Sequence, residues 1–345
     1  MKDLAIAALA ILSAVALEAM VPGGGSVKAA VLRLCSLGLF AVSLNLLVGY
    51  TGLLSFGHAT FFGLGAYGFT MLLQSGQFGV PAAFAATIAV ALLTSLPVGL
   101  VCIRLNHVYF AFLTLSIQML FHSLLIAWSG FTGGEQGLIG GIPVPVFLGV
   151  DLKDPTHSYL ANIAVFVLSL LILHRIVRSP FGAALRMIRD NTQRAVALGI
   201  DVPRVKLTAF VVASLFSAVA GMLMALYVSG AYPNFAYWTM SGEGLFMIML
   251  GGTGSFLGPA VGAFLLIILE TLVNMHTSHH GLVLGLAILA TALGLRRGVL
   301  DFALDHWKRP GWKAPRWNKP KTRATKNAGA ADGTDSHSLK SEGRA

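Results

Sequence analysis

Apolar runs long enough to cross a membrane follow one another along most of the chain. A transmembrane helix needs about 20 largely apolar residues, because the hydrocarbon layer is about 30 Å thick. Runs near that length predict spanning helices at about 4–20, 29–50, 53–73, 80–103, 108–128, 158–177, 207–228 and 255–275. Two shorter segments, 240–251 and 281–295, are marginal. The pattern predicts an all-α, polytopic helical bundle of about 8–10 transmembrane helices.

The first apolar run has a second interpretation. It follows Lys2 and ends in small residues, which is the outline of a secretory signal peptide. Asp3 interrupts the basic region that such a signal needs, and many apolar runs follow. We therefore favour an uncleaved first span.

Charged residues are scarce and segregated. They make up 11% of the chain, whereas soluble domains carry roughly 25%. Most basic residues lie in a loop at about 178–206 and in the tail at 298–345. Short loops rich in Lys and Arg stay in the cytoplasm, so both segments, and both termini, are expected there. In this scheme Lys28 and Arg33 lie on the unfavoured side.

These patterns divide the chain into two parts. Residues 1–297 are expected to form the transmembrane domain, with the basic loop on its cytoplasmic side. Residues 298–345 lack apolar periodicity and are expected to be a disordered basic tail.

Glycine and polar residues interrupt the apolar pattern in the stretch GYTGLLSFGHATFFGLGAYG, at 49–68. Backbone that leaves the helical conformation at membrane depth survives only where protein or a water-filled cavity covers it. Transporters use such broken helices to build a solute site near the bilayer midplane. The alternative is that the glycines only allow close packing, with His58 bonded to neighbouring backbone. The candidate pathway residues here are Asn45, Gly49, Thr51, Gly52, Ser55 and His58.

A second glycine-rich stretch, GGTGSFLGPAVGAF at 251–264, resembles the first. Internal repeats of broken segments are typical of two-halved transporters. Its Gly251, Gly252 and Gly254 are therefore further pathway candidates. Small residues at helical spacing, at Gly258 and Gly262, indicate close helix packing. A similar stripe comprises Ala213, Ser217 and Gly221, and such stripes can also contact a partner subunit.

Two acidic residues fall within apolar segments, Glu243 and Glu270. A charge inside the bilayer is costly and is a functional hypothesis by default. Glu243, with Ser241 nearby, can either cap the short segment GLFMIML at 244–250 or line the pathway.

The basic loop contains the pattern of a short amphipathic helix. Ser179 and Pro180 resemble an N-cap followed by an N1 proline, and Gly199 lies where a helix C-terminal glycine belongs. Pro203 is expected to prevent continuation. Such a helix can lie on anionic lipid or fit a groove on another protein. The apolar stripe comprises Leu185, Ile188, Ala195 and Leu198.

Catalytic signatures are absent from the sequence. No glycine-rich loop with Lys and Ser or Thr at the P-loop spacing occurs, and no paired-cysteine spacing indicates zinc. His276, His279 and His280 are expected to be solvated rather than to bind metal. We therefore expect no enzyme, but a transport protein. A secondary transporter driven by an ion gradient remains an alternative.

Five ordered motifs give the chain its resemblance to a known family. They are LNLLVGYTGLLSFGHATFFGLGAY, VYFAFLTLSIQML, FTGGEQGLIGGIP, IRDNTQRAVALGIDVPRVKLTAF and MLGGTGSFLGPAVGAF. From about 30 to 297 the sequence resembles LivM-type permease subunits of bacterial branched-chain amino acid ABC importers.

The resemblance implies an inner-membrane permease that binds no cofactor itself, because separate subunits bind and hydrolyse ATP. It implies as partners a related LivH-type permease, two cytoplasmic ATPases and a periplasmic or lipid-anchored solute-binding protein. It also implies that the basic loop is the coupling helix seated in the ATPase, at Arg186, Arg189, Asp190, Ala197, Leu198 and Gly199.

Neither the cargo nor the role of the tail follows from these motifs. Very similar permeases carry urea and short amides. The tail places Trp307, Trp312 and Trp317 among basic residues, a mixture that favours membrane lipids and that we do not expect to bind nucleic acid.

Overall fold

The computed structural model describes residues 25–105, 107–142, 155–276 and 285–286. The chain divides into two units, 1–307 and 308–345, and all described residues belong to the first. Within these ranges the structure is helical, with no strand longer than the isolated bridge between Leu138 and Ala231. The predicted all-α membrane bundle is confirmed.

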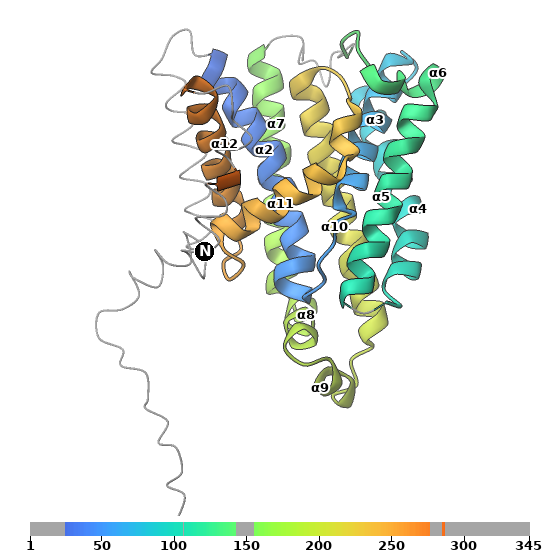
Figure 1. The fold of residues 1–345 in the computed structure, drawn as a ribbon, viewed down its shortest axis with the longest axis vertical. Coiled ribbons are helices and arrows are strands. Elements are labelled where there is room, and N and C mark those ends of the chain that lie inside the picture. Colours follow the sequence, from blue (N-terminus) through green and yellow to red (C-terminus); the bar gives the residue numbers. More distant parts are fainter. Residues whose placement is uncertain (1–24, 106, 143–154, 277–284, 287–345) are drawn as a thin grey trace, which may run out of the picture. The chain divides into compact units, whose positions relative to one another are not determined.

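Figure 1 shows the described helices in their order along the chain. In chain order they are α2 (Gly25–Asn45), the π-helical turn η1 (Leu46–Thr51), α3 (His58–Gln74), α4 (Val80–Cys102), α5 (His107–Ala127), α6 (Ser129–Thr132), η2 (Gly134–Gln136), α7 (Pro155–Arg178), α8 (Pro180–Asp190), α9 (Thr192–Ala197), α10 (Val202–Val228), η3 (Pro233–Ala236), α11 (Trp238–Gly251) and α12 (Gly258–His276).

Five described helices are long and apolar enough to cross a membrane: Lys28–Thr51, Val80–Cys102, Val108–Ala127, His157–Arg178 and Val202–Val228. Each matches a predicted span. The expected span 4–20 and most of 281–295 lie outside the described residues. The marginal segment 240–251 is α11, whose 14 residues extend about 21 Å, too short for the hydrocarbon layer.

Three helix boundaries differ from the sequence expectation. α10 begins at Val202 rather than near 207, because Pro203 lies in its first turn, where a missing N–H costs nothing. The preceding helix α9 ends at Ala197, so it does not continue through Pro203, as expected. α3 and α12 begin at His58 and Gly258 rather than at 53 and 255, because the glycine-rich stretches before them are not helical.

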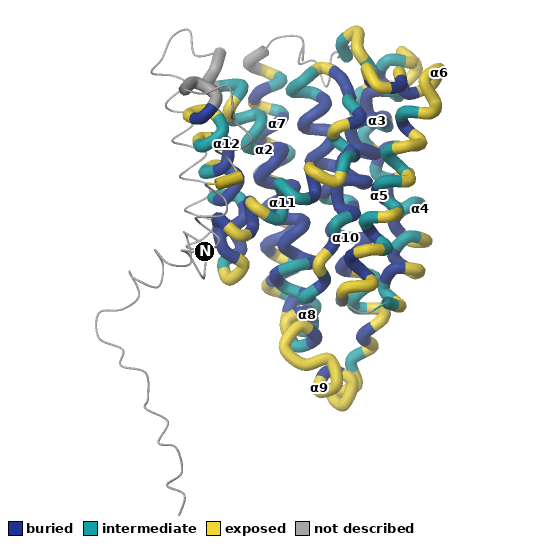
Figure 2. Tube along the Cα trace, viewed as in Figure 1, coloured by how far each residue is buried: buried dark blue, intermediate teal, exposed yellow. Residues whose placement is uncertain are grey.

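The centre of the bundle is formed by α2 and α10. In their apolar windows 72% of the residues are buried, against 22% in α4 and 28% in α5. Figure 2 shows the buried residues concentrated along α2 and α10. The outer helices expose large apolar side chains, among them Leu93, Phe112 and Leu120. Such faces suit contact with lipid tails, which are as apolar as leucine.

Close backbone contact joins α10 to α3. A Cβ added at Gly221 of α10 would lie 2.0 Å from the carbonyl oxygen of Phe62, and one at Gly65 of α3 would lie 2.1 Å from that of Ala218. Ala213 and Ser217, on the same stripe of α10, are fully buried. The small-residue stripe is thus a packing surface, and its partner is α3 of the same chain.

Candidate functional site

The first glycine-rich stretch interrupts the helix that begins as α2. The helix widens into the π-helical turn η1. It then ends at Gly52, whose φ of +76° is left-handed. Residues 53–57 are not helical, and α3 starts at His58. A Cβ at Gly49 would lie 2.2 Å from the Asn45 side-chain oxygen, so any larger residue there would force the Asn45 side chain to move. The predicted broken segment is present.

Protein groups cover the backbone around the break. The Thr51 hydroxyl donates to the Leu46 carbonyl at 2.8 Å, and the Leu53 amide donates to Leu47 at 2.9 Å. At the start of α3, the Ser217 hydroxyl donates to the carbonyl of His58 at 3.0 Å. Non-helical backbone within the bundle is thereby shielded, as a hydrocarbon environment requires.

A buried polar network continues from the break into neighbouring helices. The Ala59 amide donates to the Ser241 hydroxyl at 3.0 Å, and that hydroxyl donates to the Gln118 side-chain oxygen at 2.9 Å. Ser43 lies 2.9 Å from His58 Nε2. Neither Gln118 nor Ser43 was a sequence candidate. Gln118 is the one amide side chain in the apolar run 108–128, a signal that could have identified it.

Three of the predicted pathway residues retain polar atoms without a hydrogen-bond partner among the described residues. They are both side-chain atoms of Asn45, the hydroxyl of Ser55 and Nδ1 of His58. Each side chain is at most 1% exposed. Buried polar groups are rarely left unpaired, so these donors and acceptors are available to a polar solute or to water. Of the remaining candidates, Thr51 is occupied by the bond to Leu46, and Gly49 and Gly52 shape the backbone.

The second glycine-rich stretch also breaks a helix. α11 ends at Gly251, Gly252 has a φ of +101°, and α12 starts six residues later at Gly258. A Cβ at Gly251 would lie 1.7 Å from the Gly258 carbonyl oxygen, and one at Gly262 would lie 1.8 Å from that of Met247.

These glycines therefore let α11 and α12 pack closely as a hairpin, whereas α3 packs mainly on α10 and α4. The two breaks resemble each other locally, but the helix after each one packs differently. Gly254, the remaining candidate, lies exposed in the turn between α11 and α12.

Glu243 lies inside α11, which begins five residues earlier at Trp238 with Tyr237 in the N-cap position. It therefore does not cap the helix, and that interpretation was wrong. Its carboxyl is half-buried and interacts electrostatically with Arg33 and Glu270.

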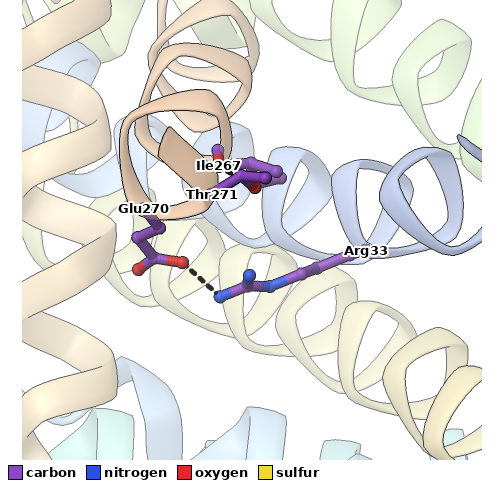
Figure 3. A network of polar contacts seen from close by, with 4 residues as sticks. All are labelled: Arg33, Ile267, Glu270 and Thr271. Carbon is purple, nitrogen blue, oxygen red and sulfur yellow. Dashed lines mark hydrogen bonds and ion pairs between the residues drawn. The ribbon is translucent and has the colours of Figure 1, made fainter. Parts of the chain in front are cut away.

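Arg33 and Glu270 form an ion pair between α2 and α12, with Nη2 and Oε2 2.5 Å apart (Figure 3). The side chains are 35% and 17% exposed. Pairing is the usual state of charged residues within a bundle.

Replacing Arg33 with methionine is expected to destabilise the bundle by about 2 kcal/mol, because Glu270 would be left unpaired in a poorly solvated position. The double replacement Arg33→Met with Glu270→Gln should regain most of the loss. Thermal unfolding in nanodiscs, followed by tryptophan fluorescence, measures both. A double variant no more stable than the single one would contradict a stabilising role for pairing.

The basic loop forms two helices rather than one. Asn191 has an extended backbone, ends α8, and accepts the Arg194 amide at 2.9 Å as the N-cap of α9. The single amphipathic helix was therefore a wrong expectation, because an asparagine side chain competes well for free amides. Ser179 has N-cap backbone angles, but its hydroxyl donates to Ile176 instead of capping α8.

The predicted apolar stripe is divided by this break. Leu185, Ile188 and Ala195 are buried, whereas Leu198, beyond the end of α9, is 64% exposed. Gly199 follows with a φ of +82°, as expected of a helix C-terminal glycine. Figure 2 shows that the tip formed by α8 and α9 is largely exposed.

The coupling candidates lie in distinct surroundings. Arg186 donates to the Val177 carbonyl at 3.3 Å and so joins α8 to α7. Arg189 donates to the carbonyl of Gly49 in η1, and its Nε lies 3.5 Å from the carboxylate of Asp190. Ala197 and Leu198 are exposed at the tip. The structure thus brings Arg189 to the break, bonds Arg186 to α7 and leaves the other candidates at the surface.

No group of three or more His, Cys, Asp or Glu side chains arranged to hold a metal occurs in the described part of the chain. The histidine cluster lies at its edge, since His279 and His280 fall outside the described residues and no side-chain placement is described for His276.

Several known permeases resemble this sequence. The LivM permease of the high-affinity branched-chain amino acid transport system of Salmonella typhimurium is 29% identical over 76% of this chain and 66% of its own length. Escherichia coli LivM is 29% identical over 72% of this chain and 63% of its own. The autoinducer 2 import permease LsrC of Klebsiella pneumoniae is 30% identical over 46% of each chain.

The matched region thus covers a little less than two thirds of the LivM relatives. No solved structure matches. The family model described as branched-chain amino acid transport system, permease component, matches residues 26–292. This range includes both the helix break and the α8–α9 tip. This chain therefore belongs to that family of multi-pass membrane permeases.

Proposed function

We propose that this chain is the translocation subunit of an ATP-driven importer for branched-chain amino acids in a bacterial inner membrane. The observation that carries the proposal is the helix break after η1, where Asn45, Ser55 and His58 keep unpartnered polar atoms inside the bundle. Such a break can form a gated passage for a small polar solute. Membership of the permease family supports the same interpretation.

The energy source in this proposal lies outside the chain. Two ATPase subunits bind ATP and hydrolyse it, a LivH-type permease completes the passage, and a binding protein delivers the solute. The chain itself uses no cofactor and is not an enzyme. The excess of arginine on α8, α9 and the adjoining loop supports a cytoplasmic position for this tip.

Branched-chain amino acids are favoured as cargo because the LivM relatives match over a larger share of the chain than LsrC does. The test is uptake of radiolabelled leucine by proteoliposomes containing all five subunits and ATP. Competition by unlabelled isoleucine and valine supports the proposal. Competition by urea, short amides or autoinducer 2 instead would assign a different cargo to the same machine.

An ion-gradient mechanism predicts uptake that needs no ATPase subunits. Uptake by this chain alone, without ATPase or nucleotide but with an ion gradient, would contradict the importer. Within the described bundle the ionisable candidates for such a mechanism are few, since Glu270 is already paired with Arg33.

The α8–α9 tip offers a separate test of ATPase docking. Val196 and Leu198 are 58% and 64% exposed although both are apolar, and apolar side chains exposed beside arginines are typical of a surface that another protein covers. Leu198→Asp is expected to reduce the co-purified ATPase about tenfold, because a charge would replace an apolar contact.

The matched control is Gln193→Asp, which places the same charge at an exposed position within α9, five residues before Leu198. It should leave the amount of co-purified ATPase unchanged. Normal recovery of the ATPase with Leu198→Asp would exclude this residue from the docking surface.

A further inference from the structure

Arg189 connects the α8–α9 tip to the helix break. It is the penultimate residue of α8, and its Nη1 donates to the carbonyl of Gly49, 140 residues earlier in the chain. Its stem passes Gly52, because a Cβ added there would lie 3.0 Å from Arg189 Cγ. The side chain is 42% exposed, so it reaches from the surface into the protein. One residue therefore contacts both glycines that define the break.

The Gly49 carbonyl needs a partner from outside its own helix. A π-helical carbonyl accepts the amide five residues ahead, but η1 ends at Thr51 and Gly52 turns the chain out of the helix. The last carbonyls of a helix lack internal partners. Gly49 is buried, and a buried backbone carbonyl is almost always paired. The guanidinium of Arg189 supplies the bond that the turn itself does not make.

α8 is well placed to move η1 through this bond. Leu185 packs into the main apolar core, and Ile188 packs with Ala195 of α9 and Val202 of α10, so a displacement of α8 is expected to move it as a unit. A single π-helical turn holds one residue more than an α-helical turn, and conversion between the two shifts the register of the residues after the turn. In this chain the segment after η1 carries Ser55 and His58.

We propose that Arg189 is a positioning residue that transmits movement of α8 to the helix break, rather than a contact of the ATPase surface. This role rests on the proposed function. When ATPase closure displaces α8, Arg189 pulls on the Gly49 carbonyl and changes the conformation of η1. Arg189→Met keeps the stem and removes the donors, whereas Arg189→Lys keeps a charge and a donor. Arg186→Met, three residues earlier on α8, is the matched control, because Arg186 bonds to α7.

The experiment uses a thiol reporter at Leu54→Cys, an exposed position in the break, since Cys35 and Cys102 are buried. In the assembled complex in liposomes, the maleimide labelling rate is measured with and without ATP and vanadate. In the otherwise unmodified chain and in Arg186→Met, we expect ATP and vanadate to change the labelling rate of this cysteine about threefold or more, corresponding to roughly 0.65 kcal/mol. Arg189→Met should show no change, while retaining bound ATPase and ATP hydrolysis, and Arg189→Lys should restore part of it.

The outcomes separate the two proposals. A nucleotide-dependent change in Arg189→Met equal to that of the parent overturns the transmitting role. Loss of the bound ATPase in Arg189→Met overturns it too, and assigns the residue to docking. If the chain that carries only Leu54→Cys binds no ATPase, the proposed importer is refuted. This result differs from failure of the transmitting role, because Arg189 is intact in that chain.

Discussion

Uptake is expected to fall about tenfold or more when Gly52 is replaced by leucine, while the importer still assembles. Gly52 has a φ of +76°, a conformation that costs other residues roughly 1–2 kcal/mol. A side chain there would also meet Arg189, whose Cγ lies 3.0 Å from the added Cβ. The substitution therefore strains the break and displaces the bond between Arg189 and Gly49.

Gly76→Leu is the matched control for backbone strain. Gly76 has a φ of +68°, but a Cβ there meets no atom within 4 Å. Uptake and bound ATPase in proteoliposomes should match those of the unmodified chain in this variant. If Gly52→Leu also transports at the normal rate, the glycine break has only a packing role.

Gly221→Val is expected to prevent correct folding, with a loss of about 3 kcal/mol or more. The new Cβ would lie 2.0 Å from the Phe62 carbonyl oxygen, and backbone atoms in a packed helix cannot rotate away. α10 and α3 would have to separate, which also breaks the bond from Ser217 to the carbonyl of His58. The measurement is the fraction of detergent-extracted protein that elutes as a single species, with its thermal midpoint.

Gly242→Val separates this contact from the general effect of placing valine in a helix. Gly242 lies within α11, and a Cβ there meets no atom within 4 Å. Its folded fraction should remain near that of the unmodified chain. Equal loss in both variants would show that the close approach of α3 and α10 does not limit stability.

The positions of most helices could be predicted from patterns within single segments of the sequence. Runs of apolar residues predicted the five long helices, because only a helix satisfies its backbone within hydrocarbon, and the span boundaries at 80–103 and 108–128 agree closely with α4 and α5. The glycines at 49 and 52 predicted the break, and the left-handed φ found at Gly52 favours glycine over residues with a side chain. The same patterns predicted one helix through Asn191, where the structure has two. Apolar spacing does not show that the Asn191 side chain can cap a new helix.

The pairings between elements were decided by the tertiary structure. Arg33 and Glu270 are 237 residues apart, and periodicity assigns each to a helix face without indicating which faces meet. The same holds for Arg189, which basic patterning assigned to the surface and which the fold turns toward the break. Sequence alone determined a helical membrane permease with a broken span, because burial and backbone satisfaction act within single segments. The tertiary structure decided which charges pair and which side chains contact the break, because those contacts depend on distances between segments that no local pattern encodes.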